Sequence, residues 1–268
     1  MLQQGLAFKG FTVEATDGRI GSVSDFLFDE TTWTLRWLVV DTGNWLIDRK
    51  LLLHPSAIDK VDTHMQALLV KLTRAQVEKS PGIATDEPVS RQMEHQLIAY
   101  YGVNPLGAAA YYDRNGFGLR PTGPGAGGEN SSAVPADPHL RSLAEVTSYH
   151  IEATDGAIGH LECFLIDDES WDIRYLVVDT ANWWFGRHVL LAPSAVREID
   201  WGRHRLHLNL TCYKIKGSPP WDPTGLLDRA YEKLLRAYYG WPDTYLPPVH
   251  KALPVAHAEP AAKVEAVS

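Results

Sequence analysis

The sequence predicts a mainly β protein in which one small unit is written twice and each copy ends in a short helical segment. An internal repeat, strand-length apolar runs separated by turns, and helical spacing at the end of each copy predict this fold. The chain has 268 residues, 45% of them hydrophobic and 22% charged, a composition typical of folded proteins. Its length suits two domains. We therefore expect two small β-barrels in tandem.

The two copies align without a gap at an offset of 138 residues, the separation of Phe11 from Tyr149. The run FTVEATDGRIG at 11–21 corresponds to YHIEATDGAIG at 149–159, and WLVVDTGNW at 37–45 corresponds to YLVVDTANW at 175–183. The register persists over about 92 residues, which is too long for a solenoid repeat. The repeat indicates duplication of a whole domain.

Short β-strands are predicted throughout each copy. The Thr-Asp-Gly turns at 16–18 and 154–156 predict a hairpin, with glycine supplying a positive φ. Runs rich in β-branched, Leu and aromatic residues predict further strands. These lie at Ser22–Asp29, Leu35–Asp41, Lys50–Leu53 and Met65–Leu72, and at His160–Asp167, Ile173–Asp179, His188–Leu191 and Arg205–Leu210. The last of them alternates strictly, so one of its faces should be buried.

Helical segments are predicted after the strands. Thr73 is suited to N-capping a short helix that extends to Lys79, and Ser80-Pro81 stops it. Apolar residues at helical spacing predict longer helices over Ser90–Tyr101 and Asp228–Tyr239, each followed by glycine.

These elements divide the chain into four parts. The first barrel and its helix occupy residues 1–112, and the second barrel and its helix occupy residues 139–245. Gly, Pro, Asn and Ser dominate 113–138, which indicates a flexible linker that lets the units move, and we expect disorder over 246–268. The duplication also favours a pseudo-two-fold pairing of the barrels, as in a homodimer of single units.

Charge and cysteine content narrow the function classes. A net charge of −8 repels phosphate backbones, so we expect no nucleic-acid partner. The two cysteines form no disulfide framework, which fits a reducing compartment. We see no signal peptide and no run of about 18 apolar residues, so we expect a cytoplasmic protein without a membrane span. Peripheral association with a membrane is compatible with this expectation.

Three motifs present in both copies resemble the PRC-barrel domain. They are Glu-Ala-Thr-Asp-Gly-x-Ile-Gly, Trp-x-x-Arg-[Trp/Tyr]-Leu-Val-Val-Asp-Thr and Leu-Leu-x-Pro-Ser-Ala, and the resemblance covers both duplicated blocks. It implies two PRC-type barrels of a family that includes the cytoplasmic barrel of the photosynthetic reaction-centre H subunit and part of a ribosome-maturation factor. It also implies protein binding and not catalysis. From the sequence we expect no transmembrane helix before the barrel, unlike in the H subunit.

Aromatic and arginine side chains in the loops at 41–50 and 179–188 form the candidate binding surface, because these residue types anchor protein interfaces. The candidate residues are Trp45, Arg49, Trp183, Trp184, Phe185 and Arg187. In the alternative interpretation, Trp45 and Trp183 plug the open end of each barrel while Asp41 and Asp179 cap loop amides. Three consecutive aromatics at 183–185 cannot all point to one side of an extended chain, so at least one should contact solvent or a partner.

Other reactive side chains fit structural roles better than chemistry. Asp17 and Asp155 precede turn glycines but lack the regular oxygen ligands of a cation loop. The acidic clusters at 29–30 and 167–169 are typical of solvated turns. His204 and His207 face opposite sides of a strand, and Cys163 and Cys212 are not shared by the two copies. We assign no metal, no cofactor and no catalytic residue.

The first functional hypothesis is a non-enzymatic cytoplasmic adaptor that binds protein partners through its barrel surfaces, for example at a membrane-associated complex. The second is a small-molecule or ion sensor with a site between the barrels, because domain interfaces favour ligand pockets. The resemblance to the H subunit adds a role in photosynthetic electron transfer as a further alternative. An enzyme is not expected, since no nucleophile, base and oxyanion donor form a recognisable arrangement.

Overall fold

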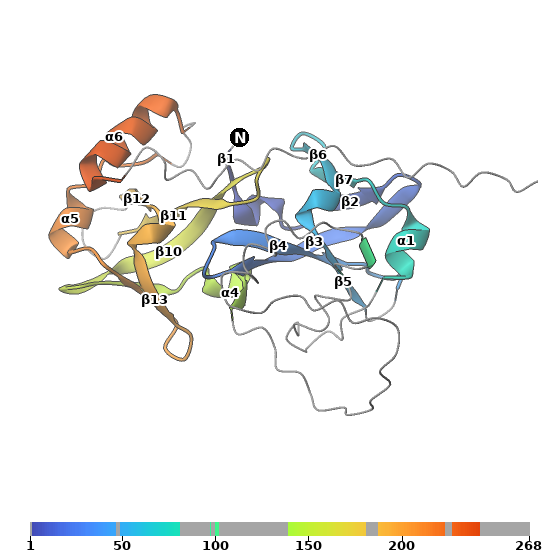
Figure 1. Cartoon of the computed structure of the whole chain (residues 1–268), viewed down its shortest axis with the longest axis horizontal. Helices are drawn as coiled ribbons and strands as arrows, with labels where there is room; N and C mark the ends of the chain where they lie inside the picture. The colour runs from blue at the N-terminus through green and yellow to red at the C-terminus, as the bar shows by residue number, and fades with distance from the viewer. Residues whose placement is uncertain are drawn as a thin grey trace, which may run out of the picture.

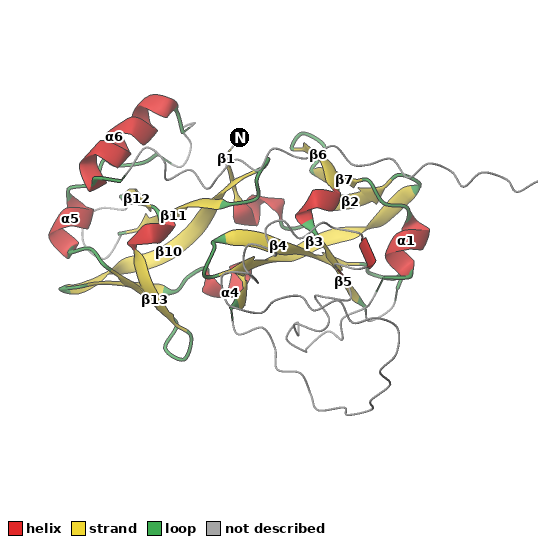
Figure 2. Cartoon of the chain, viewed as in Figure 1, coloured by secondary structure: helices red, strands yellow, loops and turns green. Residues whose placement is uncertain are grey.

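The structure, a computed structural model, describes residues 2–46, 49–80, 97, 100–101, 139–180, 187–222 and 227–241. Within these residues it contains two seven-stranded sheets and few helices, so the expectation of a mainly β protein is confirmed (Figures 1 and 2). The predicted linker at 113–138 and the predicted disordered tail at 246–268 lie outside the described residues.

Over residues 12–80, leaving out 47 and 48, the first unit has six strands of its own, a 3-10 turn and a short helix. They are β2 (Thr12–Ala15), β3 (Gly18–Asp29), β4 (Thr34–Asp41), β5 (Lys50–Leu53), η2 (Pro55–Ala57), β6 (Ile58–Asp62), β7 (Ala67–Val70) and α1 (Arg74–Glu78). The second unit repeats them at the same offset. They are β9 (His150–Ala153), β10 (Gly156–Asp167), β11 (Ile173–Asp179), β12 (His188–Leu191), η3 (Pro193–Ala195), β13 (Val196–Asp200), β14 (Arg205–Leu208) and α5 (Cys212–Lys216).

The two units have the same strand order. In the first unit it is β5-β4-β3-β2-β7-β6, and in the second β12-β11-β10-β9-β14-β13. The pairings are antiparallel except for β2 with β7 and β9 with β14, which are parallel. The order is open, because no ladder joins β5 to β6 or β12 to β13 among the described strands. A closed hydrogen-bonded barrel, as the sequence predicts, is therefore not found in either unit.

Most strand predictions agree with the structure. Lys50–Leu53, Ile173–Asp179 and His188–Leu191 are correct to the residue, and β14 buries alternate side chains as predicted. The edge strands β6 and β13 were not predicted, because each carries charged residues on its exposed side, as edges commonly do. Met65 lies in a turn before β7 and is 76% exposed.

A short N-terminal arm of each unit pairs with the sheet of the other unit. The first arm is β1 (Leu2–Gln4) with η1 (Gly5–Phe8), and β1 pairs with β10 of the second unit. The second arm is β8 (Leu140–Ser142) with α4 (Leu143–Val146), and β8 pairs with β3 of the first unit. The registers are equivalent, since Gln3 lies opposite Ile166 and Arg141 opposite Phe28. Each sheet therefore includes one strand that, by chain order, belongs to the other unit.

Equivalent residues meet each other at the centre of the molecule. Thr34 forms an isolated bridge with Asp172, its own counterpart 138 residues later, and donates a 2.8 Å hydrogen bond to its carboxylate. The amide of Leu35 donates to the carbonyl of Trp171, and the amide of Ile173 donates to that of Trp33 in the same way. Such self-pairing places a local pseudo-two-fold axis between Thr34 and Asp172.

One hydrophobic core runs through both units across this axis. Phe28 packs against Phe164 with ring centroids 5.7 Å apart, and Trp171 of the second unit stacks on Phe26 of the first at 6.1 Å. Phe8, in the first arm, contacts the same tryptophan. The two units therefore share strands and core, which restricts the relative movement that the linker composition suggests.

Helices α1 and α5 lie toward opposite ends of the molecule, whereas α4 lies near its centre (Figure 1). Thr73 and Gln76 form the capping box of α1, as the threonine predicts, and Thr211 caps α5. Helix α6 (Arg229–Tyr239) begins after its N-cap Asp228 and ends at Gly240, whose φ is +73°. This confirms the second predicted C-terminal helix. Of the first, the structure describes Leu97, Tyr100 and Tyr101, all helical.

Candidate protein-binding surface

The loop after β4 lies at one end of the molecule, and there Trp45 closes the first unit. Its ring is half-buried against the core, and the guanidinium of Arg74 in α1 lies over it at 4.6 Å. Gly43 donates to the Asp41 carboxylate at 2.8 Å, so that aspartate caps a loop amide as predicted. The plug interpretation of Trp45 thus fits the structure better than a freely exposed anchor.

Arg49 holds the end of the same loop to the end of α1. Its guanidinium donates to the carbonyls of Glu78, at 2.9 Å, and Ser80. The buried hydroxyl of Thr42 contacts the carbonyl oxygens of Leu46 and Arg49, both at 2.9 Å. Arg49 therefore fastens the loop, and Arg74, which the sequence did not single out, covers its tryptophan.

The equivalent loop of the second unit contains most of the predicted site. Trp183, Trp184 and Phe185 lie outside the described residues, so their exposure stays a prediction. Arg187 is half-buried, and its carbonyl accepts hydrogen bonds from the amide and hydroxyl of Thr180, at 3.0 and 2.7 Å. Of the six candidates, the structure describes Trp45 and Arg49 in the first unit and Arg187 in the second.

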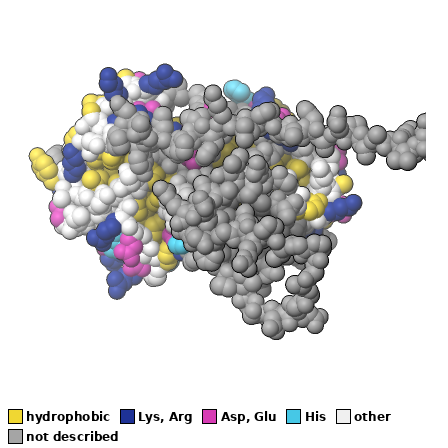
Figure 3. All heavy atoms as spheres, viewed as in Figure 1, with side chains coloured by type: hydrophobic (Ala, Val, Ile, Leu, Met, Phe, Trp, Pro, Cys, Tyr) yellow, Lys and Arg dark blue, Asp and Glu magenta, His cyan; other side chains and the backbone are white. Residues whose placement is uncertain are grey.

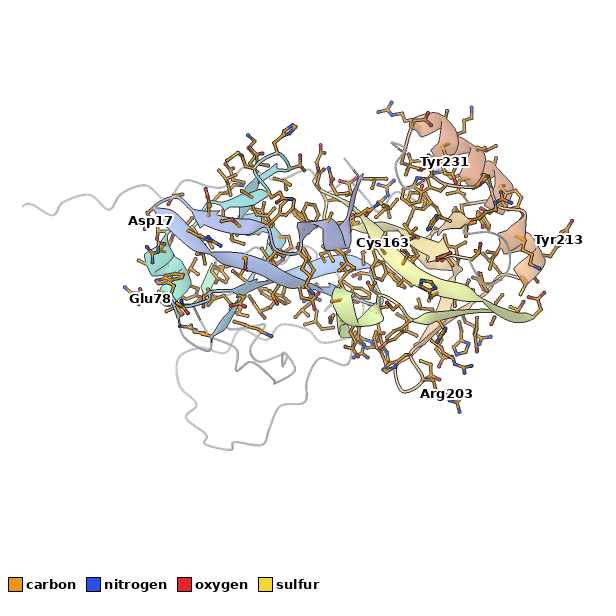
Figure 4. All side chains as sticks on the ribbon, turned by 180° about the vertical axis from the view of Figure 1, so that it is seen from behind. Asp17, Glu78, Cys163, Arg203, Tyr213 and Tyr231 are labelled. Atoms are coloured by element: carbon orange, nitrogen blue, oxygen red, sulfur yellow. The ribbon has the colours of Figure 1, made fainter. Side chains whose placement is uncertain are left out.

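A second exposed apolar surface was not predicted and lies on α5 and α6. We call it the α5–α6 face: Tyr213, Leu234 and Tyr238. Tyr213 is 85% exposed and Leu234 is 56% exposed, both far above the usual exposure of such side chains. Figure 4 shows Tyr213 at the opposite end of the long axis from Asp17 and Glu78, and Figure 3 shows hydrophobic atoms at this end.

Reciprocal hydrogen bonds between Lys214 and Tyr238 fix this face. The ammonium of Lys214 donates to the carbonyl of Tyr238, and the Tyr238 hydroxyl donates back to the carbonyl of Lys214, each at 2.7 Å. The same ammonium lies 4.3 Å from the tyrosine ring. In the first unit Tyr100 repeats half of this arrangement, since its hydroxyl donates to the carbonyl of Gln76. The exposed side chains thus stand on a rigid support.

Tyr175 and Glu232 anchor α6 to the second sheet. The Tyr175 hydroxyl donates to the Glu232 carboxylate at 3.0 Å. Tyr175 also belongs to a buried cluster that includes Leu165, Val177 and Leu235. Leu235 is fully buried while its neighbour Leu234 faces outward. The helix is therefore amphipathic, and the exposure of Leu234 is set by its position on the outer side.

The acidic residues considered as chemical candidates act on the backbone. Asp17 accepts a 2.7 Å hydrogen bond from the amide of Arg74, and Asp155 accepts one of 2.6 Å from the amide of Cys212. These amides open α1 and α5, so each aspartate ties a hairpin turn to a helix start. Hydrogen bonds from the Cys212 amide and thiol hold the pKa of Asp155 below its ordinary value.

Asp29 corrects one sequence interpretation. It is the last residue of β3, directly before the turn, and it is buried and not solvated. It accepts hydrogen bonds from the amides of Thr31 and Thr32 and pairs with Arg36 at 3.2 Å. Asp167 binds the equivalent turn and lies 3.7 Å from Arg174. Both carboxylates therefore hold the turns that lead to the pseudo-two-fold axis.

The histidines that the sequence set aside have local partners. His207 lies 3.2 Å from the Glu152 carboxylate, whereas His204 lies in a turn with its ring 4.9 Å from that of Tyr149. Within the described ranges, no three His, Cys, Asp or Glu side chains are grouped as metal ligands. The same ranges contain no helix long and apolar enough to cross a membrane.

Both thiols are buried in environments that disfavour the thiolate. Burial, with a smaller contribution from Glu162, raises the pKa of Cys163 to about 12, and burial with the nearby Asp155 also raises that of Cys212. At pH 8 only about one Cys163 side chain in ten thousand is then a thiolate, the form that attacks electrophiles. Neither cysteine is suited to nucleophilic chemistry.

We accordingly expect native protein at pH 8 to react with a thiol-specific reagent at least about a hundredfold more slowly than protein unfolded in urea. Absorbance of the released reagent group measures the rate. Because the pKa values are raised, the native rate should increase with pH up to the onset of unfolding. Rapid labelling of either cysteine at neutral pH in folded protein would contradict the burial described here.

Taken together, the unit is a small open sheet of six strands with a parallel β2–β7 pair, closed at its outer end by an aromatic loop and a short helix. Residues 7–77, from η1 through most of α1, match the family model of the PRC-barrel domain. The first unit is therefore a PRC-barrel domain. A search of curated proteins finds no match to the chain.

Proposed function

We propose that the protein is a non-enzymatic adaptor, built from two PRC-barrel units, that binds another protein through the α5–α6 face. The aromatic residues Trp183, Trp184 and Phe185, which the sequence predicts as a binding site, are included in this proposal. The exposure of Tyr213 and Leu234 on a rigid support is the observation that carries this proposal. Tyrosine is among the residues most enriched at binding hot spots, and PRC-barrel domains often take part in protein interactions.

Assignment of the second unit to the same domain type is part of this proposal. Its strands follow the same order as those of the first unit, and their bounds recur at the same offset with differences of one residue at most. The parallel β9–β14 pair corresponds to the parallel β2–β7 pair. Two equivalent units related by an axis then place α1 and α5 at opposite ends of the molecule, which suits a protein that links partners.

A ligand site between the units is less well supported. Phe28, Phe164 and Trp171 pack against residues of the opposite unit in this region, and all three are buried. A sensor would need space there for its ligand. The adaptor proposal needs no such space, because its surface lies at the end of the molecule. Cytoplasmic location and attachment to a membrane complex are compatible with it and are included in the proposal.

The test is affinity capture from native lysate with three tagged variants beside the unaltered protein. Tyr213→Ala/Leu234→Ala and Trp184→Ala/Phe185→Ala should each lose a protein that the unaltered chain retains. The free energy of unfolding of each variant should lie within about 0.5 kcal/mol of that of the unaltered protein, as is usual for surface substitutions.

Met65→Ala is the matched control, since Met65 is similarly exposed but belongs to the first unit. Binding of the captured protein should then be repeated with both components purified, by calorimetry. Retention of the same proteins by all four chains would reject the surface. A large loss of stability in the Trp184/Phe185 variant would place those aromatics in the core.

A further inference from the structure

The two arms meet near the axis through a pair of equivalent residues that have diverged in size. Gly5 opens η1, and its counterpart Leu143 opens α4. Both are buried, and they are in contact: a Cβ placed on Gly5 would lie 2.6 Å from the Leu143 Cδ2 and 2.6 Å from the Ile166 Cδ1. The absence of a side chain at Gly5 is what leaves room for Leu143.

The sites that receive the arms have also diverged in polarity. Asp25 of the first unit accepts hydrogen bonds from the Ser142 hydroxyl at 2.5 Å and the Ala144 amide at 3.1 Å of the second arm. The second unit has Cys163 at the equivalent position, and the first arm has Gln4 where the second has Ser142. A carboxylate thus binds the start of one arm, and a buried thiol occupies the place that receives the other.

The two arms also differ in charge. Glu30 of the first unit pairs with Arg141 and His139 at the start of the second arm, each at 3.3 Å. The corresponding residues on the opposite side are Asp168 and Gln3. The basic arm therefore lies on the unit that carries Glu30, and the uncharged arm lies on the other.

From these differences we propose that residues 1–112 and 139–245 act as two non-identical subunits. The interface formed by the exchanged arms favours the pairing of a first half with a second half over the pairing of two identical halves. Two first halves would bring Gly5 opposite Gly5 and leave an unfilled space. Two second halves would bring Leu143 opposite Leu143, where the structure has room for one side chain. The covalent connection then raises the local concentration of the correct partner, and the interface itself supplies the specificity.

The test uses the whole chain with a specific protease site inserted after Gly128, cleaved after purification. Native mass spectrometry of the cleaved protein at micromolar concentration should show one first half bound to one second half. Mixing two preparations that differ in isotope label should yield exchanged pairs of the same composition. Separation into free halves, or homotypic pairs in statistical proportion, would overturn the proposal.

Exchanging the two diverged residues tests the selection directly. Gly5→Leu should raise the Kd of the cleaved halves about tenfold or more, because two leucines then compete for one space. Adding Leu143→Gly to that variant should recover much of the lost affinity, since the size difference is restored in reverse. Met65→Ala, which alters an exposed side chain outside both arms, should leave the Kd unchanged.

The doubly substituted chain also separates specificity from folding. Circular dichroism of each uncleaved variant shows whether both sheets form before cleavage. A Gly5→Leu chain that folds, is cleaved and binds as tightly as the original would refute the role of this pair. A double variant whose cleaved halves bind no more tightly than those of Gly5→Leu alone would also refute it.

Discussion

Gly159→Ala is expected to destabilise the protein by about 3 kcal/mol or more, the upper end of what overpacking costs. A Cβ on Gly159 would overlap the carbonyl oxygen of Asp179 and lie 3.0 Å from the carbonyl carbon. Both atoms belong to the neighbouring strand β11, so no side-chain rotation can relieve the overlap. Urea unfolding followed by circular dichroism measures the loss.

The first unit provides a repeat of the experiment and the turn before β14 provides a control. Gly21 lies against the carbonyl of Asp41 in the same way, so Gly21→Ala should be similarly costly. Gly202 has Asp200 Oδ1 as its nearest atom, 3.7 Å from a placed Cβ, and Gly202→Ala should change stability by less than about 0.5 kcal/mol. Equal effects at Gly159 and Gly202 would show that the strands do not approach as described.

Local signals in the sequence were sufficient to predict the interior strands and the short helix capped by Thr73. The repeat offset also predicts that equivalent residues should meet if the units pair. Arm exchange could not be predicted, because β1 and β8 are three residues long and carry no alternation that distinguishes them from loops. Their pairing depends on a contact between segments more than a hundred residues apart.

The candidate surface was predictable only in part. Aromatic and arginine residues in a loop predict an interface, yet in the structure Trp45 packs on the core and Arg49 binds backbone carbonyls. These roles depend on α1, which reaches the loop only through the fold. The sequence did not indicate that Tyr213 is exposed, because one tyrosine in a short amphipathic helix is equally compatible with burial in the core. Its exposure follows from the arrangement of α5 and α6.

Trp171→Ala is expected to cost about 3–5 kcal/mol, as removal of a large buried aromatic usually does. Trp171 is 7% exposed and contacts Phe8 and Phe26, both from the opposite unit. The substitution thus removes packing from the shared core and not from one unit alone. We expect the whole variant to unfold in one transition, at a lower urea concentration than the unaltered protein. Circular dichroism during urea unfolding measures this.

Its counterpart Trp33 supplies the matched comparison. Trp33 is only half-buried and stacks on Phe28 of its own unit, with ring centroids 5.6 Å apart. Trp33→Ala should therefore cost less than Trp171→Ala, although both residues adopt a positive φ at the same point of the repeat. If Trp171→Ala instead produced two separate transitions, with the first unit unaffected, the units would be stable independently. The shared core would then be a contact between domains, and the linker, not the packing, would keep them together.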